Sequence, residues 1–252
     1  MSIETDQDLQ GIQQASKVVG ECLREMVAYA KPGMSTFELD AFGNEILRAY
    51  GAQAAPKKEY GFPGWTCISV NDEAAHGIPS RSKVLQEGDL VNIDVSAELN
   101  GYYGDNGRSF ILGEDKQGLQ PLVQASTDIL TVAISRIKGG LRLSALGSFI
   151  EKEARKRGFT TIKNLMGHGI GLKLHDKPHH IPNFNDRTNR QRFRKNTVVA
   201  VETFISTRAR YVHEMSDGWT MKSLDGSFVA QHEHTLIVTE GQPMILTHNN
   251  GI

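Results

Sequence analysis

Two acidic residues lie inside segments that have the composition of buried β-strands. Asp94 interrupts the apolar segment LVNIDVSA, and Glu202 interrupts VVAVETFI. Apolar runs of this kind are typical of strands covered on both faces. A buried carboxylate needs a cation, a hydrogen-bond network or a shifted pKa, because leaving it ionised and unpartnered is very costly. A register that turns the acid to solvent would explain one of these residues, but it explains the pair poorly.

Three more residues that can bind a metal occur in comparable places. Asp105 follows in GYYGDNGRSF, the far arm of an apparent hairpin, and Glu233 stands between two histidines at the start of the last strand. His168 lies in GHGIG, whose glycines would let the backbone approach a ligand closely. One such residue alone is more often structural. Five on separate strands that could converge indicate a common site.

The five residues together supply four carboxylates and one imidazole, and four negative charges would balance two divalent cations. A set rich in oxygen and free of thiolate fits Mn²⁺, Fe²⁺ or Co²⁺ better than structural zinc, with Zn²⁺ as a further candidate. Metal pairs about 3.5–4 Å apart share bridging carboxylates and activate water. The set therefore predicts hydrolysis of an amide or a phosphate ester.

Helical and β-rich segments alternate twice along the chain. An apolar stripe predicts a helix from Asp8 to the KPG sequence at 31–33, and the Ser35-Thr36 region caps a second helical segment that runs to about Ala54. Strands are predicted at 66–70, 89–99 and 107–112, helices at 117–138 and 144–158, and further strands at 196–206, around Trp219 and at 232–240. The repeated order predicts an α+β fold made of two related halves that face each other.

The composition is that of an ordinary globular protein. The chain has 252 residues, 39% of them hydrophobic, which is enough to bury a core without disulfides. Cys22 and Cys67 are expected to be free thiols. A formal net charge of −1 argues against nucleic acid as the main ligand. The acidic N-terminus does not resemble a signal peptide and no apolar run approaches the roughly 20 residues of a membrane span, so we expect a cytoplasmic protein.

Six segments, in order, resemble the motifs of the methionine aminopeptidases: NDEAAHGIP, VNIDV, GYYGDNGRSF, GHGIGLKLHDKP, VET and EHT. The resemblance runs from about Asp8 to Thr247. It implies a single catalytic domain over residues 1–252, with residues 1–7 as a flexible N-terminus. It also implies the pita-bread fold, in which two pseudo-symmetric halves of antiparallel strands and flanking helices surround a di-metal centre. The short separation of His175 and Glu202 leaves no room for the helical insertion of the second type, so the chain resembles type I.

The resemblance assigns a metal role to each of the five candidates. Asp94 would chelate one ion, and His168 and Glu202 the other. Asp105 and Glu233 would bridge both ions.

The resemblance also implies a substrate site. His76 and His175 match histidines that contact the substrate, and together with Glu202 as proton acceptor they form the expected catalytic set. The methionine pocket would be lined by Phe62, Cys67 and Trp219. Three positions depart from the common pattern of the family, namely Glu59, which stands where a tyrosine often lies at the pocket rim, Leu174 and Thr203.

The implied activity is removal of the initiator methionine from nascent polypeptides, with a small second residue preferred. We expect a monomer that binds neither membranes nor specific nucleic-acid sequences. Contact with the ribosome surface is an open expectation, since basic residues occur at Arg208, Arg210 and within 187–195, although a solvated charged loop explains them too. The alternatives are a prolidase or aminopeptidase P, whose members carry a further N-terminal domain, and a non-catalytic peptide or ribosome binder on the same scaffold.

Overall fold

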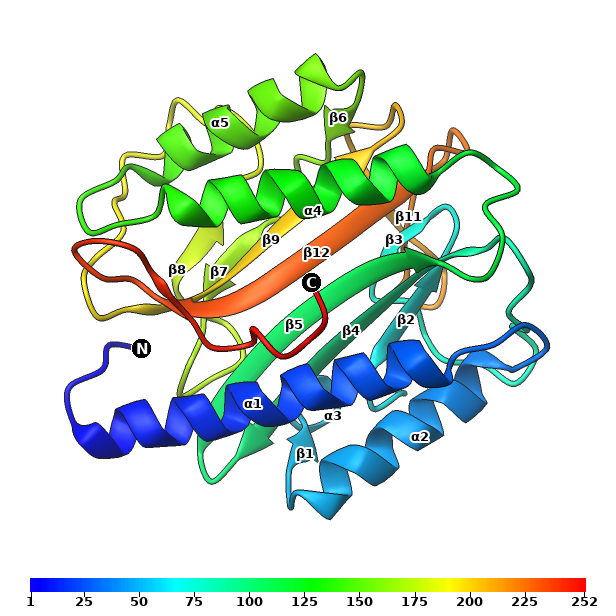
Figure 1. The fold of residues 1–252 in the computed structure, drawn as a ribbon, viewed down its shortest axis with the longest axis horizontal. Helices are drawn as coiled ribbons and strands as arrows, with labels where there is room; N and C mark the ends of the chain where they lie inside the picture. Colours follow the sequence, from blue (N-terminus) through cyan, green and yellow to red (C-terminus); the bar gives the residue numbers. More distant parts are fainter.

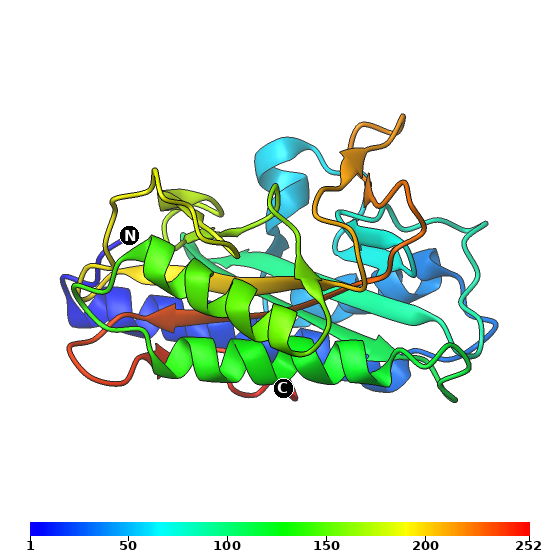
Figure 2. The same ribbon diagram turned by 90° about the horizontal axis from the view of Figure 1, so that it is seen from above.

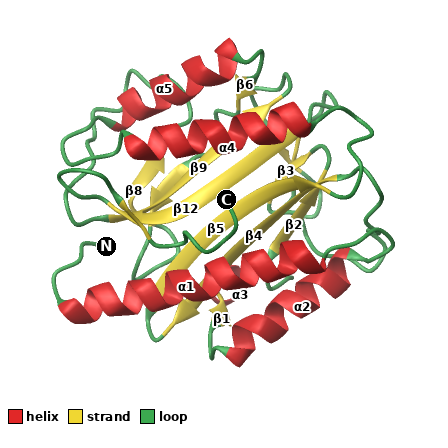
Figure 3. Cartoon of the chain, viewed as in Figure 1, coloured by secondary structure: helices red, strands yellow, loops and turns green.

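A computed structural model describes all residues, Met1–Ile252, and contains five helices and thirteen strands (Figures 1 and 3). The helices are α1 (Asp6–Tyr29), α2 (Thr36–Ala49), α3 (Ala55–Tyr60), α4 (Gln120–Ser135) and α5 (Leu143–Lys156). The longer strands are β2 (Cys67–Val70), β4 (Leu90–Leu99), β5 (Tyr102–Ile111), β8 (Asp176–Ile181), β9 (Val198–Ser206) and β12 (Val229–Ile237). The short ones are β1 (Gln53–Ala54), β3 (Glu73–Ala75), β6 (Thr160–Thr161), β7 (Gly167–Gly169), β10 (His213–Glu214), β11 (Met221–Lys222) and β13 (Met244–Ile245).

One ten-stranded sheet organises the chain. Its main path is β1-β4-β5-β12-β9-β7-β8, while β2, β13 and β6 pair with β4, β12 and β9. A separate sheet of three strands has the order β10-β11-β3. No helix has the length and apolar character required to cross a bilayer.

The first two helices begin with reciprocal capping boxes. The Thr5 hydroxyl accepts from the Asp8 amide at 3.1 Å and the Asp8 carboxylate accepts from the Thr5 amide at 3.0 Å. Ser35 and Glu38 repeat the arrangement at the start of α2. The first helix therefore begins two residues before its predicted start, and the second ends at Ala49, before its predicted end.

Residues 1–5 precede α1 and lie against the C-terminal part of the chain. Ser2 forms an isolated bridge with Thr197. The Met1 amino group donates to the Ile170 carbonyl at 2.9 Å and to the Asp176 carboxylate at 2.8 Å. The expected flexibility of residues 1–7 stays a prediction.

Each pair of helices covers its own part of the sheet, which confirms the expected two halves (Figure 1). Helices α1 and α2 pack on β2 and β4 around a cluster that includes Leu23, Leu39 and Ile93. Helices α4 and α5 pack on β9 and β12 around a second cluster that includes Leu130, Ile150 and Val199. In Figure 2 the short helix α3 (light blue) and the segment around β10 and β11 (orange) rise from the face of the sheet opposite α4.

One long antiparallel strand pair forms the centre of each half: β4 with β5 in the first and β9 with β12 in the second. Strands β4 and β5 pair from Leu90 opposite Ile111 to Leu99 opposite Tyr102. The two residues between them, Asn100 and Gly101, both have positive φ (52° and 88°), as a type I′ turn requires. Because this turn follows Leu99 directly, β5 begins five residues before its predicted start and contains Asp105.

Candidate active site

The N-terminal half supplies two aspartates from neighbouring strands. Asp94 on β4 lies opposite Gly107 of β5, and Asp105 on β5 lies opposite Ser96 of β4. The Ser96 hydroxyl donates to Asp105 Oδ1 at 2.7 Å. Burial raises the pKa of Asp94 to about 7, and burial together with the nearby Asp94 charge raises the pKa of Asp105 well above its usual value. The two carboxyl groups therefore occupy one poorly hydrated region.

The C-terminal half supplies two glutamates that face each other across strands. Glu202 of β9 lies directly opposite Glu233 of β12. One amide nitrogen, Gln231 Nε2, donates to Glu202 Oε2 at 3.3 Å and to Glu233 Oε2 at 3.0 Å. The second oxygen of Glu233, Oε1, is buried and has no hydrogen-bond partner. Burial, reinforced by neighbouring carboxylates, raises the pKa of both glutamates well above the ordinary value.

His168 completes the group from the short strand β7. Its Nδ1 lies 3.0 Å from the Gly169 carbonyl, and since a carbonyl only accepts, Nδ1 carries the proton. The Nε2 lone pair is then free, and Nε2 lies 3.6 Å from Asp105 Oδ2. Burial lowers the pKa of His168 to about 3, so the ring is neutral at pH 7. One potential ligand atom from each of Asp105, His168 and Glu233 lies within 4.8 Å of the others.

Gly167 and Gly169, which flank His168, lie against neighbouring strands. A side chain at Gly167 would overlap the Ala200 carbonyl of β9, and one at Gly169 would overlap the Lys177 carbonyl of β8. These two glycines therefore permit a close approach to the neighbouring strands, and the expectation that they let the backbone approach a ligand stays a prediction. Their absent side chains let three strands pack tightly enough to bring His168 to the aspartates.

The chemistry of this group fits divalent metal ions. No lysine or arginine forms an ion pair with any of the four carboxylates. Four acids with raised pKa values (three of them buried and Asp94 half-buried), one neutral imidazole and one unpartnered carboxylate oxygen leave a deficit of positive charge that metal ions would supply. A register that turns the acid to water is excluded for Glu202, which is 9% exposed, whereas Asp94 is half-buried.

A cavity of about 320 Å³ opens onto these residues. All of the site residues expected from the sequence contribute to its wall: Phe62, Cys67, His76, Asp94, Asp105, His168, His175, Glu202, Trp219 and Glu233. The structure thus brings together residues from nearly the whole length of the chain.

Two further histidines stand at the cavity beside His168. His76 follows β3 with φ of 54°, a left-handed conformation that is uncommon for a residue with a side chain. Gly77 permits this turn, because a side chain there would overlap the Ile68 carbonyl. The ring of His175 lies 4.2 Å from the ring of His168, centroid to centroid. Desolvation at the cavity wall lowers the pKa of both His76 and His175, although neither residue is buried, and this favours the neutral rings.

The apolar wall is formed from separate loops. Phe62 follows α3 and meets Trp219 edge to face at 5.2 Å between ring centroids. Cys67 begins β2 opposite Asp94. Burial first, and then the nearby Asp94 charge, raises the pKa of the Cys67 thiol well above its usual value. Both cysteines are free, as expected.

Tyr60 lines the cavity, although only its neighbour Glu59 was predicted at the rim. The Tyr60 hydroxyl lies 2.7 Å from His175 Nδ1, whereas Glu59 turns away and accepts from the Tyr103 hydroxyl. Both lie at the end of α3, where one residue corresponds to a rotation of about 100°. The motif EYGFP contains both residues, and the phase of the helix decides that Tyr60 rather than Glu59 faces the cavity.

The other two departures from the family pattern differ in location. Leu174 is buried and lines the cavity. Thr203 points away from it, toward helix α4, where its hydroxyl lies 3.0 Å from Ser126 Oγ. Of these two positions, only Leu174 therefore bears on the shape of the cavity.

Comparison with known proteins assigns this arrangement to a class. The profile of metallopeptidase family M24 matches residues 10–240. The chain belongs to metallopeptidase family M24, and the buried Asp105, His168 and Glu233 form its candidate metal-binding group.

Within this family the chain belongs to the methionine aminopeptidases. It is 49% identical over 247 residues to methionine aminopeptidase 2 of Bacillus subtilis (strain 168), covering 98% of this chain and 99% of that protein. The crystal structure of methionine aminopeptidase from Thermotoga maritima superposes with a TM-score of 0.93 at 35% identity, covering 98% and 99% of the two chains. The fold is therefore the pita-bread fold expected from the motifs, and the matched lengths leave no room for a large insertion.

The prolidase alternative is not supported. The prolidase from Pyrococcus furiosus has a TM-score of 0.78 at 20% identity, a likeness of fold alone. The match covers 97% of this chain but only 65% of that prolidase. The prolidase thus contains a large additional part with no counterpart in the match.

Proposed function

We propose that the cavity at the centre of the sheet is where this methionine aminopeptidase removes the initiator methionine from polypeptides. The observation that carries the proposal is the convergence of four carboxylates, three of them buried, and one neutral histidine beside a cavity with an apolar wall. A non-catalytic peptide binder would not require unpaired acids buried at such a cost.

The donor set supports two divalent ions. Asp94 would hold one ion, His168 and Glu202 the second, and Asp105 and Glu233 would bridge them. When bound, such ions lower the pKa of water and polarise the scissile carbonyl. Mn²⁺, Fe²⁺ and Co²⁺ suit this oxygen-rich set best, with Zn²⁺ as a further candidate.

The chain's own groups would orient the substrate and move protons. Glu202 would accept a proton from the attacking water and return it to the departing amine. His76 and His175, both neutral, each have one N–H to donate to the developing charge of the amide. Tyr60 holds the His175 ring through its hydroxyl.

The cavity also accounts for specificity at two positions. Phe62, Cys67 and Trp219 offer aromatic and sulfur contacts that suit an unbranched thioether side chain. The histidines stand where the second residue of the substrate would lie, so a small residue fits there and a bulky one displaces the amide. We further propose that the protein acts in the cytoplasm as a monomer. Contact with the ribosome surface is a separate part of the proposal.

The test uses purified, metal-free protein and a series of Met-X-Ser tripeptides. Each of the four metals is added back singly, and kcat/KM is measured for each X. We expect glycine, alanine and serine at X to be cut well, and leucine and lysine poorly. A flat series, or a preference for proline at X with indifference to the first residue, would contradict the proposal.

A further inference from the structure

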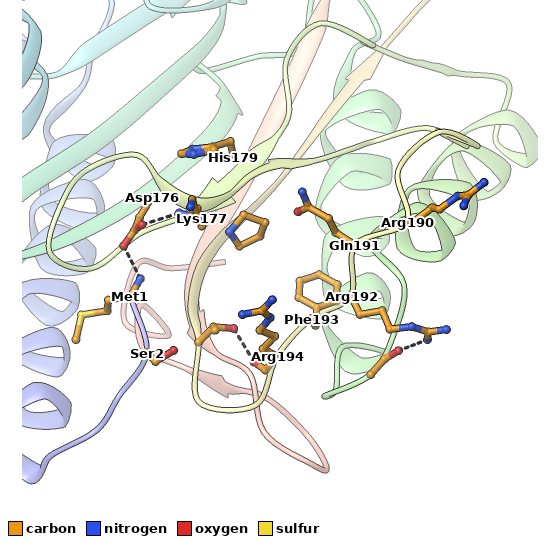
Figure 4. Close-up of a pocket in the computed structure, with 13 residues that line it drawn as sticks. Met1, Ser2, Asp176, Lys177, His179, Arg190, Gln191, Arg192, Phe193 and Arg194 are labelled. Carbon is orange, nitrogen blue, oxygen red and sulfur yellow. Dashed lines mark hydrogen bonds and ion pairs between the residues drawn. The ribbon is translucent and has the colours of Figure 1, made fainter.

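A second, larger pocket lies on the surface beside the active site (Figure 4). It has a volume of about 790 Å³ and we call it the basic pocket, after Lys177, His179, Arg190, Arg192 and Arg194 in its wall. Strand β8 forms one side and residues 190–194 form the other (Figure 4). The arginines belong to the basic run 187–195, which has no role in the proposed peptidase chemistry.

The basic pocket adjoins the active-site cavity, because His179 lines both of them. A third hollow shares His180 with the active-site cavity and Arg190 with the basic pocket. Strand β8 is therefore a common wall between the place of cleavage and a positively charged surface.

The positive charge of the basic pocket is largely uncompensated. Lys177, Arg190 and Arg194 form no ion pair, and Arg192 donates to the Gly140 carbonyl at 2.6 Å. The one carboxylate in the wall, Asp176, is occupied by the Met1 amino group at 2.8 Å. Because the whole chain has a formal net charge of −1, this concentration of cations is a local feature.

The shared wall is also an edge of the large sheet. Strand β8 ends the path of this sheet and pairs with β7 alone. Its outer edge offers few main-chain groups, because Pro178 has no N–H and the His180 carbonyl accepts from Asn189 Nδ2 at 3.3 Å, so side-chain charge is the main attraction that this wall offers. His175, which we assign to the substrate, directly precedes this strand.

We propose that the basic pocket binds acidic residues of the substrate polypeptide, downstream of its third residue. The inference rests on the proposed function, because it concerns the same substrate. A chain cut at its first peptide bond must leave the active-site cavity through an opening. A path past His179, the residue shared by both walls, would lead its downstream part along β8 toward four cationic side chains. Long-range attraction of this kind mainly raises the rate of encounter and lowers KM.

A substrate segment fits these observations better than nucleic acid does. The pocket adjoins the site of cleavage at His179, so the downstream part of a bound substrate is the nearest polyanion that could reach it. It contains no exposed phenylalanine, tyrosine or tryptophan for stacking on bases, since Phe193 is buried.

The test compares three octapeptides that share the start Met-Ala-Ser-Gly and continue with three glutamates, glutamines or lysines before a final glycine. At low ionic strength we expect kcat/KM for the glutamate peptide to exceed that for the glutamine peptide about fivefold, through KM. The lysine peptide should be the poorest of the three. In 0.5 M NaCl the three values should approach one another, because salt screens exposed charges.

The variant carrying Arg190→Gln and Arg194→Gln should reduce the glutamate-to-glutamine ratio to below twofold. It should cleave the tripeptide Met-Ala-Ser at the wild-type rate, because that substrate is too short to reach the pocket. A matched control with Arg48→Gln and Lys152→Gln removes two exposed charges elsewhere and should keep the wild-type ratio.

The two proposals fail in distinguishable ways. If Met-Ala-Ser is not cleaved with any metal, the proposed function is wrong. If Met-Ala-Ser is cleaved but the three octapeptides are cut equally at low salt, the basic pocket does not bind the substrate. Equal cleavage together with binding of poly(U) that depends on Arg190 and Arg194 would assign the surface to nucleic acid and overturn the inference.

Discussion

The two halves of the large sheet are regular inside, whereas the seam between them is not. Strands β4 and β5 pair along their whole length, and so do β9 and β12. Where the halves meet, β5 and β12 share one registered pair, Arg108 opposite His232. Each half also has its own apolar core under its own pair of helices. These two cores hold each half together, and two smaller apolar clusters cross between the halves, one of which packs Ile12 and Tyr103 against Val198.

Polar side chains join the halves at the seam. Asn92 of β4 donates to Gln231 Oε1 of β12 at 2.8 Å. Thr235 of β12 exchanges two hydrogen bonds with the backbone of Asp105, at 3.0 and 2.7 Å. The candidate metal ligands straddle the same seam, two from the N-terminal half and three from the C-terminal half. The comparison indicates that regular structure supplies stability to each half, while the irregular seam supplies the chemistry.

Chelation should have the largest effect, because it acts on both sides of the seam together. We expect complete loss of peptidase activity and its recovery on addition of Mn²⁺, Fe²⁺ or Co²⁺. If the free metal concentration is about 100 times the Kd, removing the metal should also lower the free energy of unfolding by about 3 kcal/mol. Activity and thermal unfolding measured on the same samples check both results. Full activity in extensively chelated, metal-free protein would contradict the two-metal centre.

Glu202→Gln should nearly abolish turnover while leaving both halves folded. The amide is almost isosteric, but it neither accepts a proton nor supplies negative charge. We expect kcat to fall by about 10²–10⁴-fold, measured on Met-Ala-Ser with circular dichroism as a check of folding. Glu45→Gln, an exposed glutamate on α2, serves as the control. A kcat near that of wild type would remove Glu202 from the mechanism.

The two substrate histidines offer a direct comparison of the halves, because His76 comes from one and His175 from the other. His76→Ala and His175→Ala should each lower kcat/KM by about 10²–10³-fold, the usual loss for one donor to a transition state. Metal content should stay unchanged in both. Loss of an ion from either variant, by metal analysis, would show that the residue is a ligand and that our assignment is wrong.

Asn92→Ala should have the smallest effect, and it separates the seam from the cores. It leaves the buried Gln231 amide without its donor, at a cost of about 1–3 kcal/mol in unfolding free energy. Because Gln231 bonds Glu202 and Glu233, metal affinity should also fall.

The control for this prediction is Leu130→Ala in the core under α4, which should cost about 2–5 kcal/mol and leave metal affinity unchanged. Urea unfolding and metal titration distinguish the two variants. If Asn92→Ala leaves metal affinity intact, the seam does not position the ligands.

Much of the fold was predictable because it depends on local patterns. Apolar patterns placed the four long helices, the Ser35-Thr36 cap marked the start of the second, and the apolar runs around Asp94 and Glu202 placed two central strands. Strands β7 and β8 were not predicted, because Gly-His-Gly and a segment with a proline and two histidines have no strand propensity. Strand β7 owes its conformation to pairing with β9, and β8 owes its conformation to pairing with β7.

The sequence by itself determined which groups must be neutralised. Acids within apolar strands require a common partner wherever the chain folds, and motif order identified the family. Tertiary structure decided how these groups meet. Register set Glu202 against Glu233, helical phase chose Tyr60 over Glu59, and glycine packing brought His168 to Asp105. These outcomes depend on contacts between distant segments, and a shift of one residue in a strand or helix turns a side chain to another face.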